Sequence, residues 1–135
     1  MKKIYAITII VIFLIVTIFL FFFTDENTAN KRFLFSFGIK VEDNPCIAED
    51  FYIPERFDDY YNSYNSLQIE SGLSLSPYKG KKATRYTYKV LNFPDKDVTV
   101  FVNVITVYSK PVAGDINSPK LNGFMLPLSY FISQK

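Results

Sequence analysis

The stretch "KKATRYTYKVLNFPDKDVTVFVNVITVY", Lys81–Tyr108, decides the fold of this chain. Residues 82–90 alternate, with Tyr86, Tyr88 and Val90 on one face, which is typical of a strand. Residues 92–97 hold a Pro and two Asp and predict a turn. Residues 98–108 are rich in β-branched side chains, and both of their faces are apolar. We therefore predict a central strand that is at least partly covered on both sides.

The pattern continues toward the C-terminus. Ser109-Lys110-Pro111 predicts a second turn, after which Val112–Asn117 returns as a strand. Gly114 inside that strand is typical of a bulge. The segment Leu121–Phe131 is apolar enough to dock on the domain.

Toward the N-terminus, two short helices and short extended segments are expected. Thr24–Phe37 predicts a helix that Gly38 ends. A strand signal at residues 39–41 follows, then a turn at residues 43–45 and an extended segment, Cys46–Ile53.

The second helix is expected over Pro54–Ser71. Pro54 suits the first turn, and acidic residues suit the positive end of the helix dipole. Gly72 ends the helix. One apolar stripe runs along it, made of Phe57, Tyr60, Tyr61, Tyr64 and Leu67.

This order of elements predicts an α+β domain with a helix packed on an antiparallel sheet. The same order is found in cystatin-like and PepSY-type domains, an analogy at the level of the fold that does not determine function. We expect the Tyr86, Tyr88 and Val90 face of the strand to pack on the helix of residues 54–71, with Lys81, Arg85 and Lys89 toward solvent.

A membrane anchor precedes the domain. Ile4–Phe23 is an uncharged run that spans roughly 30 Å as a helix, the thickness of the hydrocarbon core. Lys2 and Lys3 before it predict a cytoplasmic tip, residues 1–3, and an exterior C-terminal part. Residues 24–30 are then a juxtamembrane linker and residues 31–135 an extracytoplasmic domain. A cleaved signal peptide is the alternative, although the run is long and Asn27-Thr28-Ala29 is a poor cleavage site.

Composition excludes several functions. Subtracting Lys2 and Lys3 from the 15 basic residues leaves 13, which balance the 13 acidic residues of positions 24–135. The exterior part therefore has no general affinity for nucleic acid. The chain has no His and one Cys, which excludes an internal disulfide, Ser-His or Cys-His nucleophile pairs and a Cys/His zinc site. No cofactor is expected.

Four segments carry recognisable motifs: "RFLFSFGIKV" (Arg32–Val41), Ile53–Val90 with its "YNSLQ", "LSPYKGK" and "RYTY" pieces, "VAGDINS" (Val112–Ser118) and "LNGFM" (Leu121–Met125). These segments resemble the domain-of-unknown-function family DUF4830. Family members often carry Gly-Gly-Asp and a Cys in the hairpin, where this chain has Ala113-Gly114-Asp115 and Asn117. The resemblance implies a Gram-positive, membrane-anchored or secreted single domain. It implies no catalytic residue.

The densest group of basic side chains is Lys79, Lys81, Lys82, Arg85 and Lys89. As a site, it would bind lipid head groups, an anionic envelope polymer or an acidic partner. The favoured interpretation is an edge strand that Lys keeps soluble. Ser76-Pro77-Tyr78-Lys79 matches Ser-x-x-Lys, but Pro77 and Gly80 predict a turn, and the companion motifs of penicillin-recognising enzymes are absent.

Four further candidates have simple structural explanations. The tyrosines of the helix and strand form a ligand platform or amphipathic core residues, and their spacing favours the core. Asp58 and Asp59 point about 100° apart and suit the helix dipole. Asp115, beside Gly114, is the best single polar candidate, although an Asp there often satisfies a turn or bulge. Cys46 is expected to be buried, with a disulfide between chains as the alternative.

Three functions remain open. The favoured one is a non-enzymatic module that binds or regulates a partner at the cell envelope, either a protein or an anionic polymer. A small hydrolase-like or isomerase-like enzyme would use Tyr, Lys and Asp converging in a pocket. A structural homodimer is the third, weakened because the anchor lacks small-x-x-x-small spacing.

Overall fold

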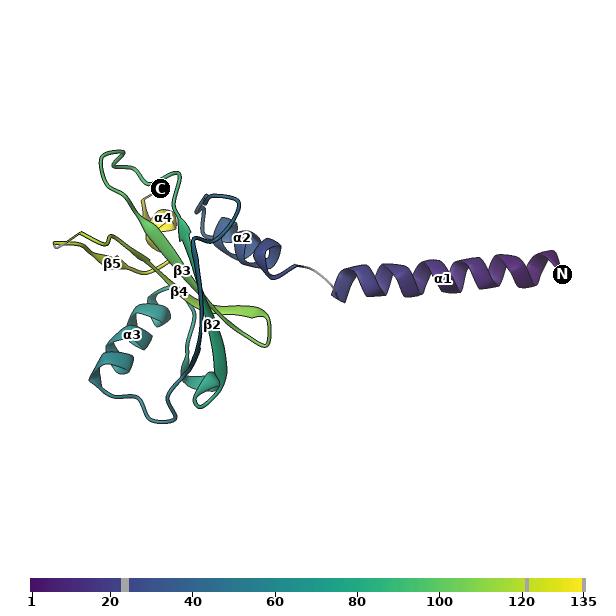
Figure 1. The fold of residues 1–135 in the computed structure, drawn as a ribbon, viewed down its shortest axis with the longest axis horizontal. Helices are drawn as coiled ribbons and strands as arrows, with labels where there is room; N and C mark the ends of the chain where they lie inside the picture. The colour runs from purple at the N-terminus through teal and green to yellow at the C-terminus, as the bar shows by residue number, and fades with distance from the viewer. Residues whose placement is uncertain (23–24, 121, 135) are drawn as a thin grey trace.

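The computed structural model describes residues 1–22, 25–120 and 122–134. Phe23 at the end of the expected anchor, Thr24 at the start of the expected helix and Leu121 at the start of the tail lie outside these residues. The first helix is α1 (Lys2–Phe22). Its segment Lys2–Leu20 is the one helical span in the described part of the chain that is long and apolar enough to cross a membrane. It extends away from the α+β domain that follows (Figure 1).

The sheet is an antiparallel meander in which the five strands pair in sequence order. The strands are β1 (Ile47–Tyr52), β2 (Lys82–Lys89), β3 (Phe101–Val107), β4 (Lys110–Asn117) and β5 (Met125–Leu126). A two-residue turn connects β3 and β4, whereas residues 90–100 connect β2 and β3. The predicted α+β fold with a central β3 is confirmed.

Helices cover opposite faces of this sheet (Figure 1). They are α2 (Glu26–Ser36) on one face and α3 (Asp59–Glu70) on the other, with a 3-10 turn, η1 (Ser76–Tyr78), and a short C-terminal α4 (Tyr130–Ser133). Two separate cores result. The larger lies under α2, and the smaller lies on the α3 side.

The face of β2 that carries Tyr86, Tyr88 and Val90 packs under α2, so the expected packing on α3 is wrong. Tyr88 is fully buried, and its hydroxyl donates to Asn27 Oδ1 at 2.7 Å. Tyr86 donates to Glu26. Periodicity showed which side chains share a face. The choice between two helices depends on tertiary structure, which periodicity does not encode.

Helix α3 begins later than Pro54. Ile53 remains paired with the chain, because its N–H donates to the Lys81 carbonyl at 2.9 Å and its carbonyl accepts from Gly80. Asp58 then caps the helix by accepting from the Tyr61 N–H at 2.9 Å. The expected role of Asp58 and Asp59 at the helix N-terminus is confirmed, and that of Pro54 is wrong.

The segments after β3 differ from expectation in one detail. The irregularity between β3 and β4 skips Val112, while Gly114 stays in register with Val104. A Cβ on Gly114 would lie 2.4 Å from the Asn103 carbonyl oxygen, so the strands approach too closely for any side chain there. The tail docks as predicted, because Leu128 is fully buried in the larger core.

Candidate functional site

The basic side chains of β2 do not form an unneutralised patch. β2 lies between β1 and β3, so the expected edge strand is wrong. The acidic residues of β1 face two of its cations: Arg85 Nη2 lies 2.7 Å from Glu49, and Lys82 Nζ lies 4.0 Å from Asp50. Lys79 Nζ lies 4.6 Å from the centre of the Phe57 ring. Lys81 and Lys89 are exposed.

The Ser-x-x-Lys match has no catalytic geometry. Ser76 begins the 3-10 turn η1, and its hydroxyl accepts from Asn65 Nδ2 at 3.2 Å. The Lys79 ammonium lies over Phe57 instead. The predicted turn is therefore confirmed.

The tyrosines are divided between the two faces of the sheet. On α3, Tyr60 and Tyr64 stack in parallel at 6.3 Å, and Tyr60 contacts Tyr61 edge-on at 5.5 Å. Tyr86 and Tyr88 belong to the opposite core. No single platform therefore joins all five. Tyr60 is 62% exposed, so the outer edge of the α3 stripe lies in solvent rather than in the core.

Asp115 is the centre of a polar network on the α3 face. Its carboxylate is buried, with the residue 1% exposed. The Tyr64 hydroxyl donates to Oδ1 at 2.6 Å, and Asn117 Nδ2 donates to Oδ2 at 2.9 Å. Asn103 Nδ2 lies 3.4 Å from both carboxylate oxygens. The sequence identified Asp115 as a polar candidate but not its partners.

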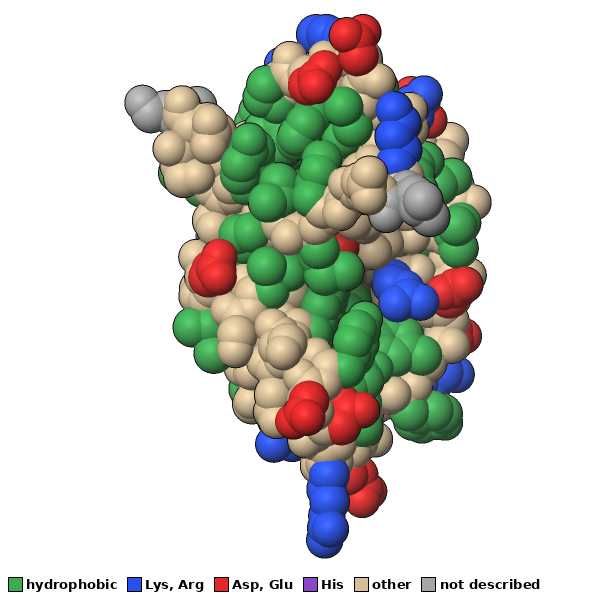
Figure 2. All heavy atoms as spheres, turned by 90° about the vertical axis from the view of Figure 1, so that its left-hand side faces the viewer, with side chains coloured by type: hydrophobic (Ala, Val, Ile, Leu, Met, Phe, Trp, Pro, Cys, Tyr) green, Lys and Arg blue, Asp and Glu red, His purple; other side chains and the backbone are tan. Residues whose placement is uncertain are grey.

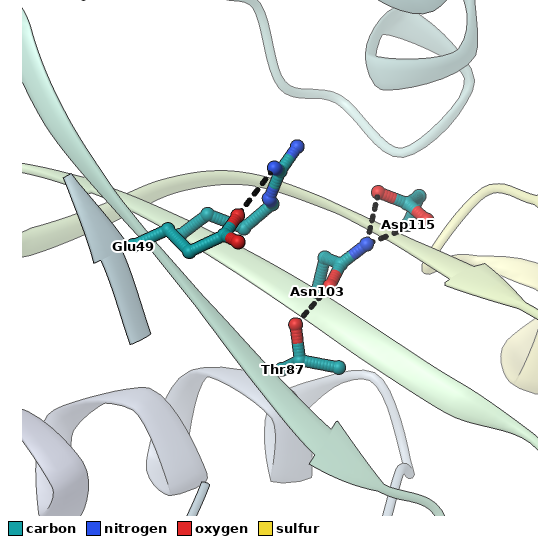
Figure 3. A network of polar contacts seen from close by, with 5 residues as sticks. Glu49, Thr87, Asn103 and Asp115 are labelled. Atoms are coloured by element: carbon teal, nitrogen blue, oxygen red, sulfur yellow. Dashed lines mark hydrogen bonds and ion pairs between the residues drawn. The ribbon is translucent and has the colours of Figure 1, made fainter. Parts of the chain in front are cut away.

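The network continues across the sheet as a row. Thr87 on β2 lies opposite Asn103 on β3, and Asn103 lies opposite Asp115 on β4. The Thr87 hydroxyl donates to Asn103 Oδ1 at 2.7 Å. Figure 3 shows these side chains beside the ion pair of Glu49. The row and the ion pair together place hydrogen-bonding groups from four strands on one face.

Electrostatics keep Tyr64 protonated. Burial and the neighbouring Asp115 carboxylate raise the pKa of Tyr64 well above its ordinary value of 10.0. The phenol therefore stays a hydrogen-bond donor at neutral pH. The hydrogen bond to Glu49 raises the pKa of Arg85 above its ordinary value, which keeps the guanidinium charged.

A groove lies on the half of this face that α3 leaves uncovered. We call it the open sheet groove, and its volume is about 500 Å³. Its lining consists of apolar Ile47, Phe101 and Pro119, polar Thr87, Asn103 and Asn117, the Arg85–Glu49 pair and Cys46. A second cavity of only about 60 Å³ lies beside it, between the tyrosines of α3 and Arg85, Asn103 and Asp115.

The α3 side of the molecule has a mixed surface. Figure 2 shows hydrophobic side chains gathered along its middle, with most charged side chains toward its rim. Such a surface is typical of ligand sites, where apolar walls carry a few placed polar groups. Among the described residues, no group of three His, Cys, Asp or Glu side chains is placed to hold a metal ion.

Cys46 is exposed, so the expectation of a buried thiol is wrong. It lies just before β1, where its Sγ donates to the Thr87 carbonyl at 3.3 Å, and its side chain borders the groove. Because β1 is an edge strand, its first residues are not covered by a neighbouring strand on their outer side.

Sequence reasoning missed Thr87, Asn103, Asn117 and Glu49. One signal for them exists. Asn103 interrupts a run of β-branched residues on the face it shares with Phe101 and Ile105. A polar amide in the middle of a central strand needs a partner, which indicates a polar network at that position.

The comparisons with known proteins give a family. The sequence model of the family described as Domain of unknown function (DUF4830) matches residues 33–111. No curated protein and no solved structure matches the chain. The match runs from within α2 to the start of β4, so it includes Thr87 and Asn103 and ends before Asp115. Since it covers more than half of the 135 residues, the chain belongs to the DUF4830 family.

Proposed function

We propose that this chain is a membrane-anchored, non-catalytic module that binds a protein partner in the open sheet groove. In this proposal residues 4–23 stay in the membrane and residues 1–3 are cytoplasmic. Residues 24–30 link the anchor to an extracytoplasmic domain, residues 31–135, at the cell membrane. The apolar, unburied helix α1 supports the anchor, and the two lysines before it support the orientation.

The observation that carries the proposal is the uncovered half of the α3 face. A groove of about 500 Å³ falls within the usual range of binding pockets, about 300–1,000 Å³. Its polar row is held in place by hydrogen bonds that end on buried Asp115. Such a row is preorganised, so a ligand meets fixed donors and acceptors.

The chemistry of the groove favours a protein over an anionic envelope polymer. Glu49 neutralises Arg85, so the groove offers no excess positive charge. Ile47 is 50% exposed and Phe101 is partly exposed, which suits an apolar side chain of a partner. Arg85 retains a fork of N–H donors, which suits backbone carbonyls or a carboxylate.

A small enzyme is the second candidate, because Asp115 and the Tyr64 hydroxyl converge beside a cavity and Tyr64 has a shifted pKa. The shift is upward, away from the range in which a side chain exchanges protons at neutral pH. The cavity at this pair is about 60 Å³, below the size of ordinary substrate pockets. These two quantities favour binding over proton transfer.

Photocrosslinking in cells tests the groove. A photoreactive amino acid replaces Ile47 or Phe101 in the full chain, and exposed Tyr52 and Tyr108 outside the groove serve as matched control positions. We expect both groove positions to yield the same adduct, and Thr87→Arg to abolish it. Equal adducts from the control positions would show that the groove is not the site.

Tyr64→Phe should retain the adduct. If it retains the adduct but abolishes the cellular function, the enzyme is favoured.

Cys46 tests the topology. It is the single Cys of the chain and it is exposed, so a membrane-impermeant maleimide reports the side on which the domain lies. We expect labelling of cells stripped of any wall, and none for Cys46→Ser. Labelling only after lysis would place the domain inside. Release of a chain lacking residues 1–22 into the medium would identify a cleaved signal peptide.

A further inference from the structure

A second groove lies on the opposite side of the domain, at α2. We call it the juxtamembrane groove, and its volume is about 550 Å³. Its apolar lining includes Phe35, Val41 and Leu91, and its rim carries Lys31, Arg32 and Lys40. Phe35 is 66% exposed and Leu91 is 55% exposed, so two large apolar side chains face outward here.

The three cations of this groove lack acidic partners among the described residues. Over residues 1–22, 25–120 and 122–134, the cation–carboxylate pairs are Lys82–Asp50 and Arg85–Glu49, both on the β1–β2 side. Within the described part of the chain, no acidic residue lines the juxtamembrane groove. The nearest acids in sequence are at the start of α2, where Glu26 accepts from Tyr86, and at exposed Glu42.

The chain itself holds this groove close to the end of α1. Glu26 follows Phe22 by four residues, a separation of at most about 14 Å for a fully extended chain. Lys31 lies five residues further along a helix that rises about 1.5 Å per residue. If α1 crosses a bilayer, the groove therefore lies within about one domain diameter of the head groups, whatever the path of the connection.

We propose that the juxtamembrane groove docks on the bilayer that α1 crosses, with Lys31, Arg32 and Lys40 on anionic phospholipid head groups and Phe35 and Leu91 at the level of the upper acyl chains. This inference rests on the proposed anchoring by α1. Each cation beside an anionic membrane strengthens attachment about fivefold. Phe and Leu are typical of the apolar faces that surface-bound helices bury at the boundary between head groups and acyl chains. Docking would fix the domain on the membrane with its open sheet groove on the far side of the sheet.

The absence of Trp from the sequence makes a direct test simple. Phe35→Trp gives a single fluorophore in the groove, and Tyr52→Trp gives a matched one at an exposed position on β1. The full chain is reconstituted into vesicles of phosphatidylcholine, with or without phosphatidylglycerol. The measurements are the Trp emission maximum and quenching by lipids brominated near the head-group end of the acyl chain.

We expect a blue shift and quenching for Phe35→Trp in vesicles with phosphatidylglycerol, and neither for Tyr52→Trp. Lys31→Ala, Arg32→Ala and Lys40→Ala added singly should each lower the docked-to-undocked ratio about fivefold. Lys96→Ala, an exposed cation outside the groove, should not change it. Raising the salt from 0.1 M to 1 M should weaken docking, because screening shortens from about 10 Å to about 3 Å.

Emission from Phe35→Trp that is the same in both lipid mixtures would overturn the proposal. So would quenching that the three Ala variants leave unchanged, or a shift that appears only on adding an acidic protein or a soluble anionic polymer. Flotation with the vesicles after alkaline extraction separates this failure from failure of the anchor. A chain that floats but is not quenched is anchored and undocked, whereas a chain that does not float lacks the anchor itself.

Discussion

The two faces of the sheet differ in what covers them. Under α2, large apolar side chains of the helix and of the sheet meet in one core, to which the C-terminal tail adds Leu128. On the α3 side, apolar packing is limited to one end, around Ile53, Leu75 and Ile105. The other end is polar and open, and α3 reaches its margin through the Tyr64 hydroxyl, which donates to buried Asp115.

This difference separates two tasks. The α2 face buries enough apolar surface to hold the domain together. Its two tyrosine hydroxyls are hydrogen-bonded, Tyr88 to Asn27 and Tyr86 to Glu26. The α3 face keeps hydrogen-bonding groups fixed but leaves them accessible to a ligand. Substitutions on the first face should therefore mainly change stability, whereas substitutions in the open sheet groove of the second face should mainly change binding.

Tyr88→Ala should have the largest effect on stability. It removes a fully buried aromatic ring and leaves a cavity in the larger core. Such a change costs about 3–5 kcal/mol. That is a large share of the roughly 5–15 kcal/mol expected for a domain. Urea unfolding of the chain in a non-ionic detergent, followed by circular dichroism, measures it. The exposed Tyr52→Ala is the control, and equal losses would show that the α2 face is not the main core.

Gly114→Ala should follow in size. A Cβ at this position would lie 2.4 Å from the Asn103 carbonyl oxygen and 3.0 Å from Leu128, so β3 and β4 must separate. We expect a loss of about 3 kcal/mol, the upper end of overpacking costs. Gly72→Ala is the contrast, because its φ of +74° is strained for Ala but no atom lies within 4 Å. A smaller loss at Gly114 than at Gly72 would contradict the close approach.

Tyr64→Phe should cause an intermediate loss of stability. It deletes the 2.6 Å hydrogen bond to Asp115 and leaves a buried carboxylate with fewer donors. The expected loss is about 2 kcal/mol, typical of a hydrogen bond to a charged group. The double variant with Asp115→Asn tests the coupling. If the two losses simply add, the phenol and the carboxylate do not act as a pair in the folded protein.

Alkaline pH should weaken the α2 face. Burial and the hydrogen bond to Glu26 raise the pKa of Tyr86 from 10.0 to about 12. Between these values the folded state keeps a proton that the unfolded chain releases. The contribution of Tyr86 to the free energy of unfolding is therefore fully present below about pH 10 and is lost as the pH rises toward 12. Urea unfolding from pH 8 to 12 should show this fall, and Tyr86→Phe should make it shallower. A flat profile would mean that Tyr86 titrates alike in both states.

Local patterns predicted the elements well because strand and helix periods are local. The alternation of residues 82–90 and the two apolar faces after residue 98 correspond to β2 and β3. The prediction that the Tyr88 face of β2 packs on α3 was wrong. Both α2 and α3 present apolar side chains, and only the path of the chain decides which helix covers Tyr88. The boundary at Asp58 was also missed, since Pro54 is equally compatible with the end of a strand-like segment.

The candidate site was predicted only at Asp115. Its partners Asn103, Asn117 and Thr87 are neutral, and neutral polar residues in strands usually face solvent. The row exists because three strands align in register, which joins residues 28 positions apart in sequence, from Thr87 to Asp115. The neutralisation of Arg85 by Glu49 likewise depends on β1 pairing with β2.

The smallest effect on stability, and the most informative one, is expected for Arg85→Ala. Its ion pair with Glu49 is short, at 2.7 Å, but about half exposed, so its loss should cost below about 1 kcal/mol. Lys82→Ala is a matched control, because Lys82 pairs with Asp50 from the same two strands and lies outside the open sheet groove. Both variants should unfold at nearly the same urea concentration as the unmodified chain. Only Arg85→Ala should reduce crosslinking from Phe101, because the lost N–H donors line the groove. Arg85→Lys should restore the charge but not the fork of donors, and so only part of the crosslinking. If Lys82→Ala reduces crosslinking equally, general surface charge explains binding. If Arg85→Ala instead unfolds the chain, the α3 face is as structural as the α2 face and the division between them fails.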